Sequence, residues 1–161
     1  MDLVEARTHI AEALVESIFR RARYHVEPFR VEQALRWGRE DFSPNFRAAR
    51  VGDDGVAREL LVEVKYRPSI EQFLSVETQR ADRSVFVLAR RQWPALHFVL
   101  VSDRPAPDRS CFQVLPVARH APGDAFRTID LHEAKELEIF PANVEDHEAL
   151  TRRIFSLLAG G

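Results

Sequence analysis

The chain has 161 residues, of which 45% are hydrophobic, and its formal net charge is −2. This length is typical of one domain with a real hydrophobic core, and the composition excludes a disordered chain and a strongly basic nucleic-acid-binding chain. No apolar stretch reaches the roughly 20 residues that span a bilayer. We therefore expect a single domain over residues 1–161, with no membrane segment.

The first part of the chain predicts one helix followed by strands. Residues 3–21 repeat apolar side chains at the three-to-four spacing of an amphipathic helix. Residues 23–30 alternate weakly and predict a strand, and residues 31–44 have room for one helical turn before Gly38 and Pro44 break it. Residues 45–51 and 56–67 predict a β-hairpin around the sequence GDDG, because Asp-Gly tolerates the positive φ of a tight turn.

The second part of the chain alternates between helices and strands. Ser69 followed by Gln72 is typical of a capping box, and it predicts a helix reaching about Arg80. The continuous apolar runs 84–89 and 95–101 predict central strands covered on both faces. Residues 111–117 predict an edge strand, because Pro116 cannot donate to a ladder, and residues 144–158 predict a last helix. This order indicates an α/β fold with a mixed central sheet flanked by helices.

The cysteine content and the first residues bear on the cellular compartment. Cys111 is the only cysteine, so the chain cannot form an internal disulfide. The sequence MDLVEARTHIAEAL is acidic and amphipathic, whereas a signal peptide begins basic and continues apolar. We therefore expect a cytoplasmic protein.

Strand 59–67, with the sequence ELLVEVKYR, places a glutamate and a lysine two positions apart among apolar residues. Glu63 and Lys65 share one face of the strand, about 6.5 Å apart along it. A solvated strand face is the simplest interpretation of these two charges. If the neighbouring strands are covered on both faces, however, a charge in such a sheet needs a partner or a metal ion, and a lined cleft meets that need.

Pro44-Asn45 followed by Glu63-Val64-Lys65 resembles the motifs of the PD-(D/E)XK nuclease superfamily. In that superfamily a proline-aspartate pair enters the second core strand and a (D/E)-X-K motif lies on the third. The predicted elements over about residues 3–101 agree with its restriction-endonuclease-like αβββαβ core, and residues 102–161 are then a C-terminal extension with a last helix. The resemblance implies a metal-dependent endonuclease that hydrolyses phosphodiester bonds of duplex DNA, with Mg²⁺ or Mn²⁺ as the cofactor.

The resemblance also implies a role for each matched residue. Glu63 and the carbonyl of Val64 are implied metal ligands, and Asn45 stands where the superfamily has a metal-binding aspartate. Lys65 is implied beside the attacking water and the phosphate. Glu12 on the first helix takes the place of a helical glutamate that faces the metal.

Glu12 and Asn45 each have alternatives. Glu16 lies one turn after Glu12 on the same helix face and is the substitute candidate, although a solvated helix face is the simpler interpretation of either glutamate alone. Asn45 offers a neutral oxygen but lacks the negative charge that holds a divalent cation. Asp41 is a candidate replacement for the missing carboxylate, and the aspartates at 53 and 54 are expected to form the turn.

Three functions follow from these observations. The first is an active endonuclease, or the nuclease subunit of a DNA-processing system, which the intact Glu63-Val64-Lys65 motif favours. The second is a disabled nuclease-fold module that binds nucleic acid or a protein partner, and the third is a structural subunit in which Glu63 and Lys65 form an ion pair; Asn45 favours these two. Two origins of Asn45 are considered. Either evolution replaced the aspartate of the motif, or the asparagine is a deliberate replacement that inactivates the protein.

The distribution of charge and the absence of other motifs narrow the choice of partners. Residues 20–67 carry eleven Lys/Arg against eight Asp/Glu, so this part is expected to face phosphate. A homodimer is expected only by analogy with enzymes that cut two strands. No glycine-rich nucleotide loop and no zinc-binding histidine spacing occurs in the sequence.

Overall fold

The computed structural model describes residues 2–29, 36–37, 40–116 and 124–160, and for residues 36–37 and 40–41 it describes the backbone alone. The central feature is a six-stranded mixed sheet with the order β1-β4-β5-β6-β7-β8. Its strands are β1 (His25–Pro28), β4 (Phe46–Val51), β5 (Ala57–Tyr66), β6 (Leu96–Val101), β7 (Phe112–Leu115) and β8 (Ile129–Asp130). A separate two-stranded sheet joins β2 (Arg36–Trp37) and β3 (Glu40–Asp41).

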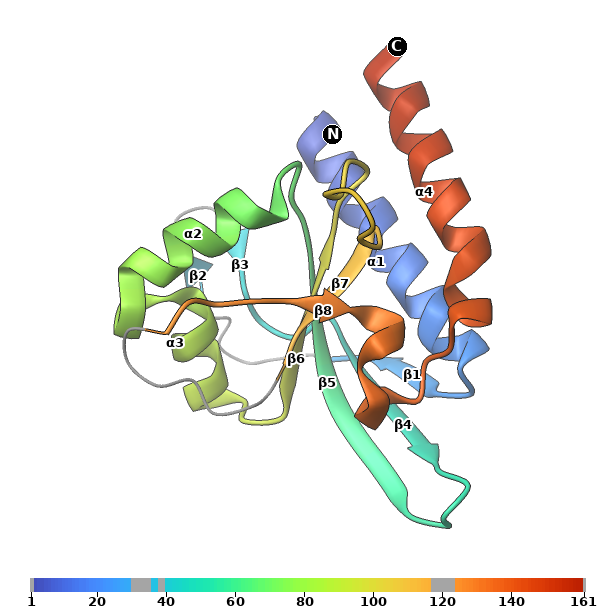
Figure 1. Ribbon diagram of the computed structural model, residues 1–161. Coiled ribbons are helices and arrows are strands. Elements are labelled where there is room, and N and C mark those ends of the chain that lie inside the picture. Colours follow the sequence, from blue (N-terminus) through green and yellow to red (C-terminus); the bar gives the residue numbers. More distant parts are fainter. Residues whose placement is uncertain (1, 30–35, 38–39, 117–123, 161) are drawn as a thin grey trace.

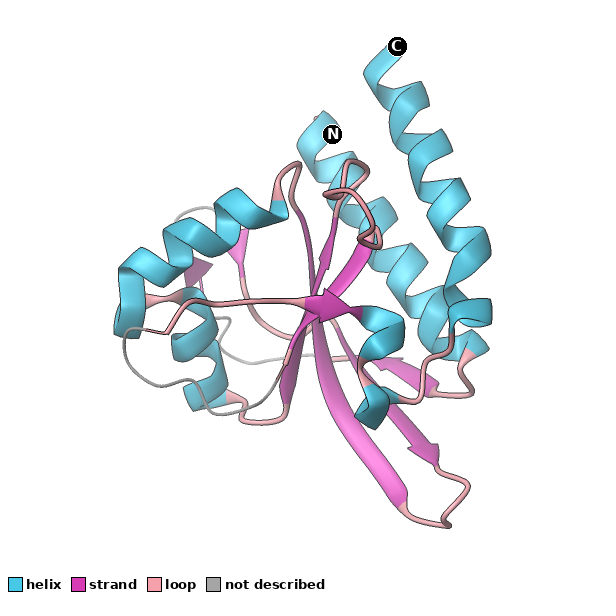
Figure 2. Ribbon diagram, in the orientation of Figure 1, coloured by secondary structure: helices cyan, strands magenta, loops and turns pink. Residues whose placement is uncertain are grey.

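Helices cover both faces of the six-stranded sheet, as Figures 1 and 2 show. The α-helices are α1 (Leu3–Arg21), α2 (Ile70–Arg80), α3 (Val85–Gln92) and α4 (Pro141–Gly160), and the short 3₁₀ helices are η1 (Ala81–Arg83), η2 (Leu131–Glu133) and η3 (Lys135–Leu137). One hydrophobic core lies between the sheet and α1 with α4, and a second lies between the sheet and α2 with α3. The predicted mixed α/β fold is confirmed at this level.

Local sequence explains where several elements begin. The Asp2 carboxylate caps α1 by accepting a hydrogen bond from the Glu5 amide at 2.7 Å, and the Ser69 hydroxyl caps α2 in the same way through the Gln72 amide at 3.2 Å. In the turn between β4 and β5, Gly55 has the positive φ of 77° that glycine adopts at no steric cost. The predictions of the first helix, the hairpin and the α2 cap are therefore confirmed.

Strand β5 has different neighbours along its length. It pairs antiparallel with β4 from Ala57 to Val62, where it faces Phe46, the first residue of β4. It pairs in parallel with β6 from Leu61 to Tyr66, and α2 and α3 form the connection between these two strands. The last residues of β5 consequently extend past the beginning of β4, which leaves room beside them for side chains.

The expected strand at residues 84–89 is wrong, because these residues begin helix α3. The Ser84 hydroxyl accepts a hydrogen bond from the Phe86 amide at 3.1 Å, and Glu77 of α2 accepts one from the Val85 amide at 2.8 Å. These two caps satisfy amides that a helix leaves open at its first turn. A short apolar run has the same appearance in a buried strand and in a buried helix, so periodicity did not separate the two.

Strand β7 is not the edge strand that Pro116 predicts. It pairs antiparallel with β6 on one side and with β8 on the other, and Pro116 follows its last residue. The helical turn expected within residues 31–44 falls partly outside the described residues, and its described part at 36–37 and 40–41 pairs as β2 and β3. The last helix is confirmed and is longer than expected, because it spans Pro141–Gly160.

The residues after β6 belong to the same sheet and the same core. They supply β7, β8 and α4, and Phe155 of α4 stacks on Tyr66 of β5 with ring centroids 4.9 Å apart. Helices α1 and α4 lie side by side, and their outer ends carry the two termini (Figure 1). Among helices built from the described residues, none has the length and apolar character needed to cross a membrane.

Candidate active site

Glu63 and Lys65 lie on the face of β5 that is turned toward α2 and α3. Both side chains are buried, with 0% of Glu63 and 8% of Lys65 exposed to solvent. The Lys65 Nζ lies 2.5 Å from the Glu63 Oε1, so the two charges form a buried ion pair. The same ammonium lies 5.0 Å from the centre of the Phe42 ring, which adds a cation–π contact. The interpretation of a solvated strand face is therefore wrong.

Asn45 lies immediately before β4 and connects three segments of the chain. Its backbone amide donates to the Val62 carbonyl at 2.8 Å, which continues the ladder by one bond. Its side-chain Oδ1 accepts from the Val64 amide at 2.6 Å, and its Nδ2 donates to the Glu12 Oε1 at 3.3 Å. The orientation of the side-chain amide is fixed, because only its oxygen can accept from a backbone N–H.

The backbone of Val64 is available to the site because β4 begins too late to cover it. The β4 ladder ends at the pair Phe46–Val62, and Val64 lies two residues farther along β5. Within one strand residue the N–H and the C=O point to the same edge, and the N–H of Val64 points to Asn45. The Val64 carbonyl therefore faces the edge of β5 where the Asn45 side chain lies.

Glu12 reaches this edge from α1, and its environment disfavours its charged form. Burial raises the pKa of the Glu12 carboxyl above its usual value, and the nearby charge of Glu16 raises it further. The positive charges of His9 and Lys65 and the hydrogen bond from Asn45 oppose this shift of the pKa without cancelling it. Glu12 is thus a partly desolvated carboxylate within electrostatic range of the Lys65 ammonium.

The structure brings together all five residues expected at the site. Glu12 comes from α1, Asn45 from the residue before β4, and Glu63, Val64 and Lys65 from β5. Glu12, and not the alternative Glu16, makes the hydrogen bond to Asn45. Glu63 is fully buried, whereas the Glu12 side chain is 29% exposed.

Of the aspartates considered as replacements for a first-motif carboxylate, Asp53 and Asp54 do not join the described site. The side chain of Asp41 lies outside the described residues. Asp54 lies in the β4–β5 turn, where it accepts a hydrogen bond from the Val56 amide at 3.0 Å and pairs with Arg58. Asp53 belongs to the same turn, at the opposite end of β4 from Asn45. The expectation that both aspartates form the turn agrees with this placement.

Two neighbours of the site were not singled out from the sequence. Phe42 lies under the Lys65 ammonium, and His9 has its Nδ1 3.9 Å from the Glu12 Oε2. The three-residue separation of His9 and Glu12 on a predicted helix indicates such proximity in advance. No sequence pattern places Phe42, because it precedes the core strand and reaches Lys65 only through the tertiary fold.

The donor atoms at the site are those that a hard divalent cation prefers. Glu12 and Glu63 supply carboxylates, Asn45 an amide oxygen, and Val64 a peptide carbonyl. Mg²⁺ and Mn²⁺ bind carboxylate, carbonyl and water oxygens. The Asn45 oxygen already accepts from Val64, but it has a second lone pair. These residues therefore fit such a cation, with two carboxylates in place of the three that an aspartate at position 45 provides.

A second group of potential metal ligands lies at the end of β8. Ligand atoms of Asp130, His132 and Glu133 all lie within 4.8 Å of one another. The Asp130 carboxylate, however, already accepts from the Arg109 Nε and from the Ser110 amide, each at 3.0 Å. These hydrogen bonds fix the loop before β7, and we assign this group a structural role.

Comparisons of the chain with protein-family models, with curated proteins and with solved structures found no match. The geometry at Glu12, Asn45 and the end of β5 is therefore what supports a functional conclusion.

Proposed function

We propose that this protein is a metal-dependent endonuclease that hydrolyses phosphodiester bonds of DNA, built on a restriction-endonuclease-like core. One observation carries the proposal. Two segments that are far from β5 in the sequence place Glu12 and Asn45 at the Val64 backbone, between the ion-paired residues Glu63 and Lys65. A chain that needs only an ion pair on β5 has no reason to direct Glu12 and Asn45 to the same place.

The order of elements supports the same proposal. When the small β2–β3 sheet and the additional helix α3 are set aside, the chain runs α1, β1, β4, β5, α2 and β6. This is the αβββαβ order of the superfamily, with the first three strands antiparallel and the last one parallel to its neighbour. Asn45 precedes the second of these strands and the Glu63-Val64-Lys65 motif lies on the third, as the resemblance requires.

The residues have distinct roles in this proposal. Glu63, Glu12, Asn45 and the Val64 carbonyl would hold the cation, which would supply positive charge at the scissile phosphate. Lys65 keeps its ammonium beside the attacking water and favours the water's deprotonated form. In the reaction the water oxygen bonds to phosphorus, one P–O ester bond breaks, and a proton from the water ends on the leaving oxygen. Burial of Glu63 and Lys65 excludes bulk water, which strengthens these interactions.

A disabled nuclease-fold module is the second candidate, and the amide of Asn45 favours it. The Nδ2 of this residue, and not an oxygen, points to the Glu12 carboxylate. An N–H group cannot bind a cation. Here the Asn45 N–H donates to a Glu12 oxygen that would bind the cation in the endonuclease. In this candidate the Asn45 side chain closes the site by linking α1 to β5, and the chain retains only a binding function.

Plasmid cleavage by position-45 variants separates the two candidates. We expect the wild type to nick supercoiled plasmid in Mn²⁺, and Asn45→Asp to nick it faster because a third carboxylate tightens cation binding. Asn45→Asp with Lys65→Ala should not nick. Cleavage only by the aspartate variant would identify the disabled module, whereas no cleavage by either protein would reject the endonuclease.

Thermal shift by Mn²⁺ tests cation binding without any need for turnover. A ligand that binds the folded state raises the melting temperature by mass action. We expect this rise in the wild type and its loss in Glu63→Gln. The matched control is Glu59→Gln, because Glu59 lies on the same strand but is exposed and pairs with Arg47. If Mn²⁺ raised the melting temperatures of both variants equally, the proposal that Glu63 binds a cation would be rejected.

A further inference from the structure

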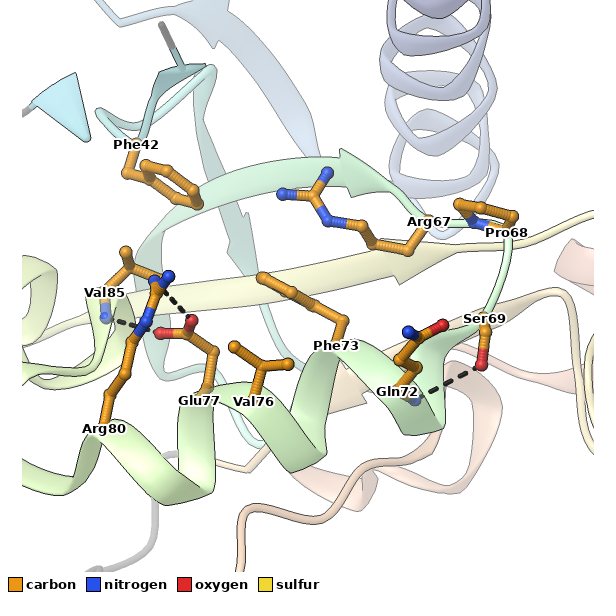
Figure 3. A pocket seen from close by; sticks show the side chains of 10 residues that line it. All are labelled: Phe42, Arg67, Pro68, Ser69, Gln72, Phe73, Val76, Glu77, Arg80 and Val85. Carbon is orange, nitrogen blue, oxygen red and sulfur yellow. Dashed lines mark hydrogen bonds and ion pairs between the residues drawn. The ribbon is translucent and has the colours of Figure 1, made fainter. Parts of the chain in front are cut away.

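A pocket of about 560 Å³ adjoins the Glu63–Lys65 pair, between the end of β5 and helix α2. Figure 3 shows the Arg67 guanidinium and the Phe42 and Phe73 rings directed into one space. The residues that matter for its chemistry are Phe42, Arg67, Phe73, Val76, Glu77 and Arg80. The pocket thus combines flat surfaces with two guanidinium groups and one carboxylate.

Phe42 connects this pocket to the candidate active site. Its ring lines the pocket and also lies 5.0 Å from the Lys65 Nζ. Arg67, which follows Lys65 by two residues, lines the same space. A group held in the pocket therefore lies against the same Phe42 ring that contacts the ammonium we place beside the scissile phosphate.

The chemistry of the lining favours a planar, anionic ligand. The Arg67 guanidinium carbon lies 4.3 Å from the centre of the Phe73 ring, so the cation packs against the aromatic ring. Guanidinium and aromatic surfaces stack on nucleic-acid bases, and guanidinium also binds phosphate through a fork of N–H donors. Arg80 adds positive charge at the other end of the pocket, where it pairs with Glu77 at 2.9 Å. Val76 adds an apolar wall.

We propose that this pocket binds one unpaired nucleotide of the DNA substrate, with its base against Arg67 and Phe73 and its phosphate near the guanidinium groups. The inference rests on the proposed function, because it takes DNA as the ligand and Lys65 as the neighbour of the scissile bond. Bases within a duplex present only their edges to the grooves, whereas stacking surfaces need an exposed base face. The substrate is therefore DNA with a single-stranded tail, flap or gap next to the cleaved bond.

Val76→Glu tests the pocket without disturbing the core. Val76 is 42% exposed, and a glutamate there places negative charge where the phosphate would bind. The matched control is Leu150→Glu, because Leu150 is 43% exposed on α4 and does not line the pocket. Both variants make the same change of charge, so they share any effect that comes only from net charge.

The measurement is fluorescence anisotropy in EDTA with two labelled DNAs, a duplex with a single-stranded tail and the fully paired duplex of the same sequence. We expect the wild type and Leu150→Glu to prefer the tailed DNA, and Val76→Glu to bind it about tenfold more weakly, since charge repulsion opposes binding at close range. Phe73→Leu, which keeps an apolar side chain without a π-face, should weaken this binding by about 5- to 150-fold.

The results distinguish failure of the pocket from failure of the nuclease. Equal affinity of the wild type for both DNAs, no binding of either DNA, or equal losses in Val76→Glu and Leu150→Glu would each overturn the pocket proposal. A preference for tailed DNA that only the pocket variants lose would support it, even if no position-45 variant cleaves. Cation-dependent cleavage without such a preference would support the endonuclease proposal and reject the pocket proposal.

Discussion

The side-chain amide of Asn45 donates a hydrogen bond to the Glu12 carboxylate at 3.3 Å, across 33 positions of sequence. The same side chain accepts from the Val64 amide at 2.6 Å. Asparagine can satisfy both neighbours because it carries one donor group and one acceptor group, whereas an ionised aspartate carries only acceptors. Asn45, which differs from the aspartate of the motif that the chain resembles, therefore complements its surroundings when no cation is present.

Replacing Asn45 with aspartate should destabilise the protein when no divalent cation is present. The variant loses the donor to Glu12 and places two carboxylates against each other, which we expect to cost about 1–3 kcal/mol of unfolding free energy. Urea denaturation in EDTA at neutral pH measures this loss, and Mn²⁺ should reverse it. Gln92→Glu, which changes an amide to a carboxylate at an exposed position, is the control. Equal stability of the wild type and Asn45→Asp in EDTA would contradict the prediction.

Glu12→Gln should change the pH dependence of stability. Burial raises the pKa of Glu12 in the folded state, so the folded protein binds this proton more strongly than the unfolded chain does. The stability that this proton contributes is present below the ordinary glutamate pKa and is lost as pH rises through the raised pKa. In EDTA the variant should therefore match the wild type in acid and exceed its melting temperature at neutral pH. Glu5→Gln, an exposed change on the same helix, is the control, and an equal gain there at neutral pH would contradict the prediction.

Lys65→Met should destabilise the protein more than the loss of one surface charge would. The change removes the ion-pair partner from Glu63, whose side chain has no solvent exposure. Removing one member of a buried ion pair costs about 3–5 kcal/mol. Combining it with Glu63→Gln should recover part of this loss, and a double-mutant cycle by urea denaturation measures the coupling. Additive losses would mean that the pair does not couple.

Glu77→Gln should weaken the junction between α2 and α3. The buried Glu77 carboxylate accepts from the Val85 amide at 2.8 Å and from the Ser84 hydroxyl at 3.1 Å. Hydrogen bonds to a charged group contribute about 1.5–3 kcal/mol, so we expect a loss within that range in urea denaturation. Glu71→Gln on the exposed side of the same helix is the control, and a similar loss there would refute the assigned role.

Elements that depend on local sequence could be predicted, whereas elements that depend on tertiary contacts could not. Helix α1, the β4–β5 hairpin and the α2 cap follow from periodicity, from Asp-Gly and from Ser69, all of which act within a few residues. Helix α3 was expected to be a strand because its decisive cap, Glu77, comes from the preceding helix. Strand β8 was not expected because two residues carry no periodicity, and its partner β7 was assigned to the edge because Pro116, which follows β7, cannot donate to a ladder.

The candidate site shows the same division. The resemblance of the motif residues to a nuclease family named Glu12, Asn45, Glu63, Val64 and Lys65, and the fold brings them together. The hydrogen bonds of the Asn45 amide and the ring of Phe42 under Lys65 depend on segments that no local pattern relates. The resemblance therefore named residues that lie near one another, but it did not predict the contacts that decide their charge balance.

The two kinds of pairing along β5 also set an order of assembly. Its first residues pair with β4 across a short turn, and such local contacts form quickly because they close a small loop. Glu63 and Lys65 lie farther along β5, opposite Phe98 and Leu100 of β6. We expect this pairing to form later, because α2 and α3 lie between the two strands in the sequence. In pulsed hydrogen exchange the hairpin amides should become protected before those of β6. A nascent chain that ends before β6 thus holds the motif residues without the pairing that orients them.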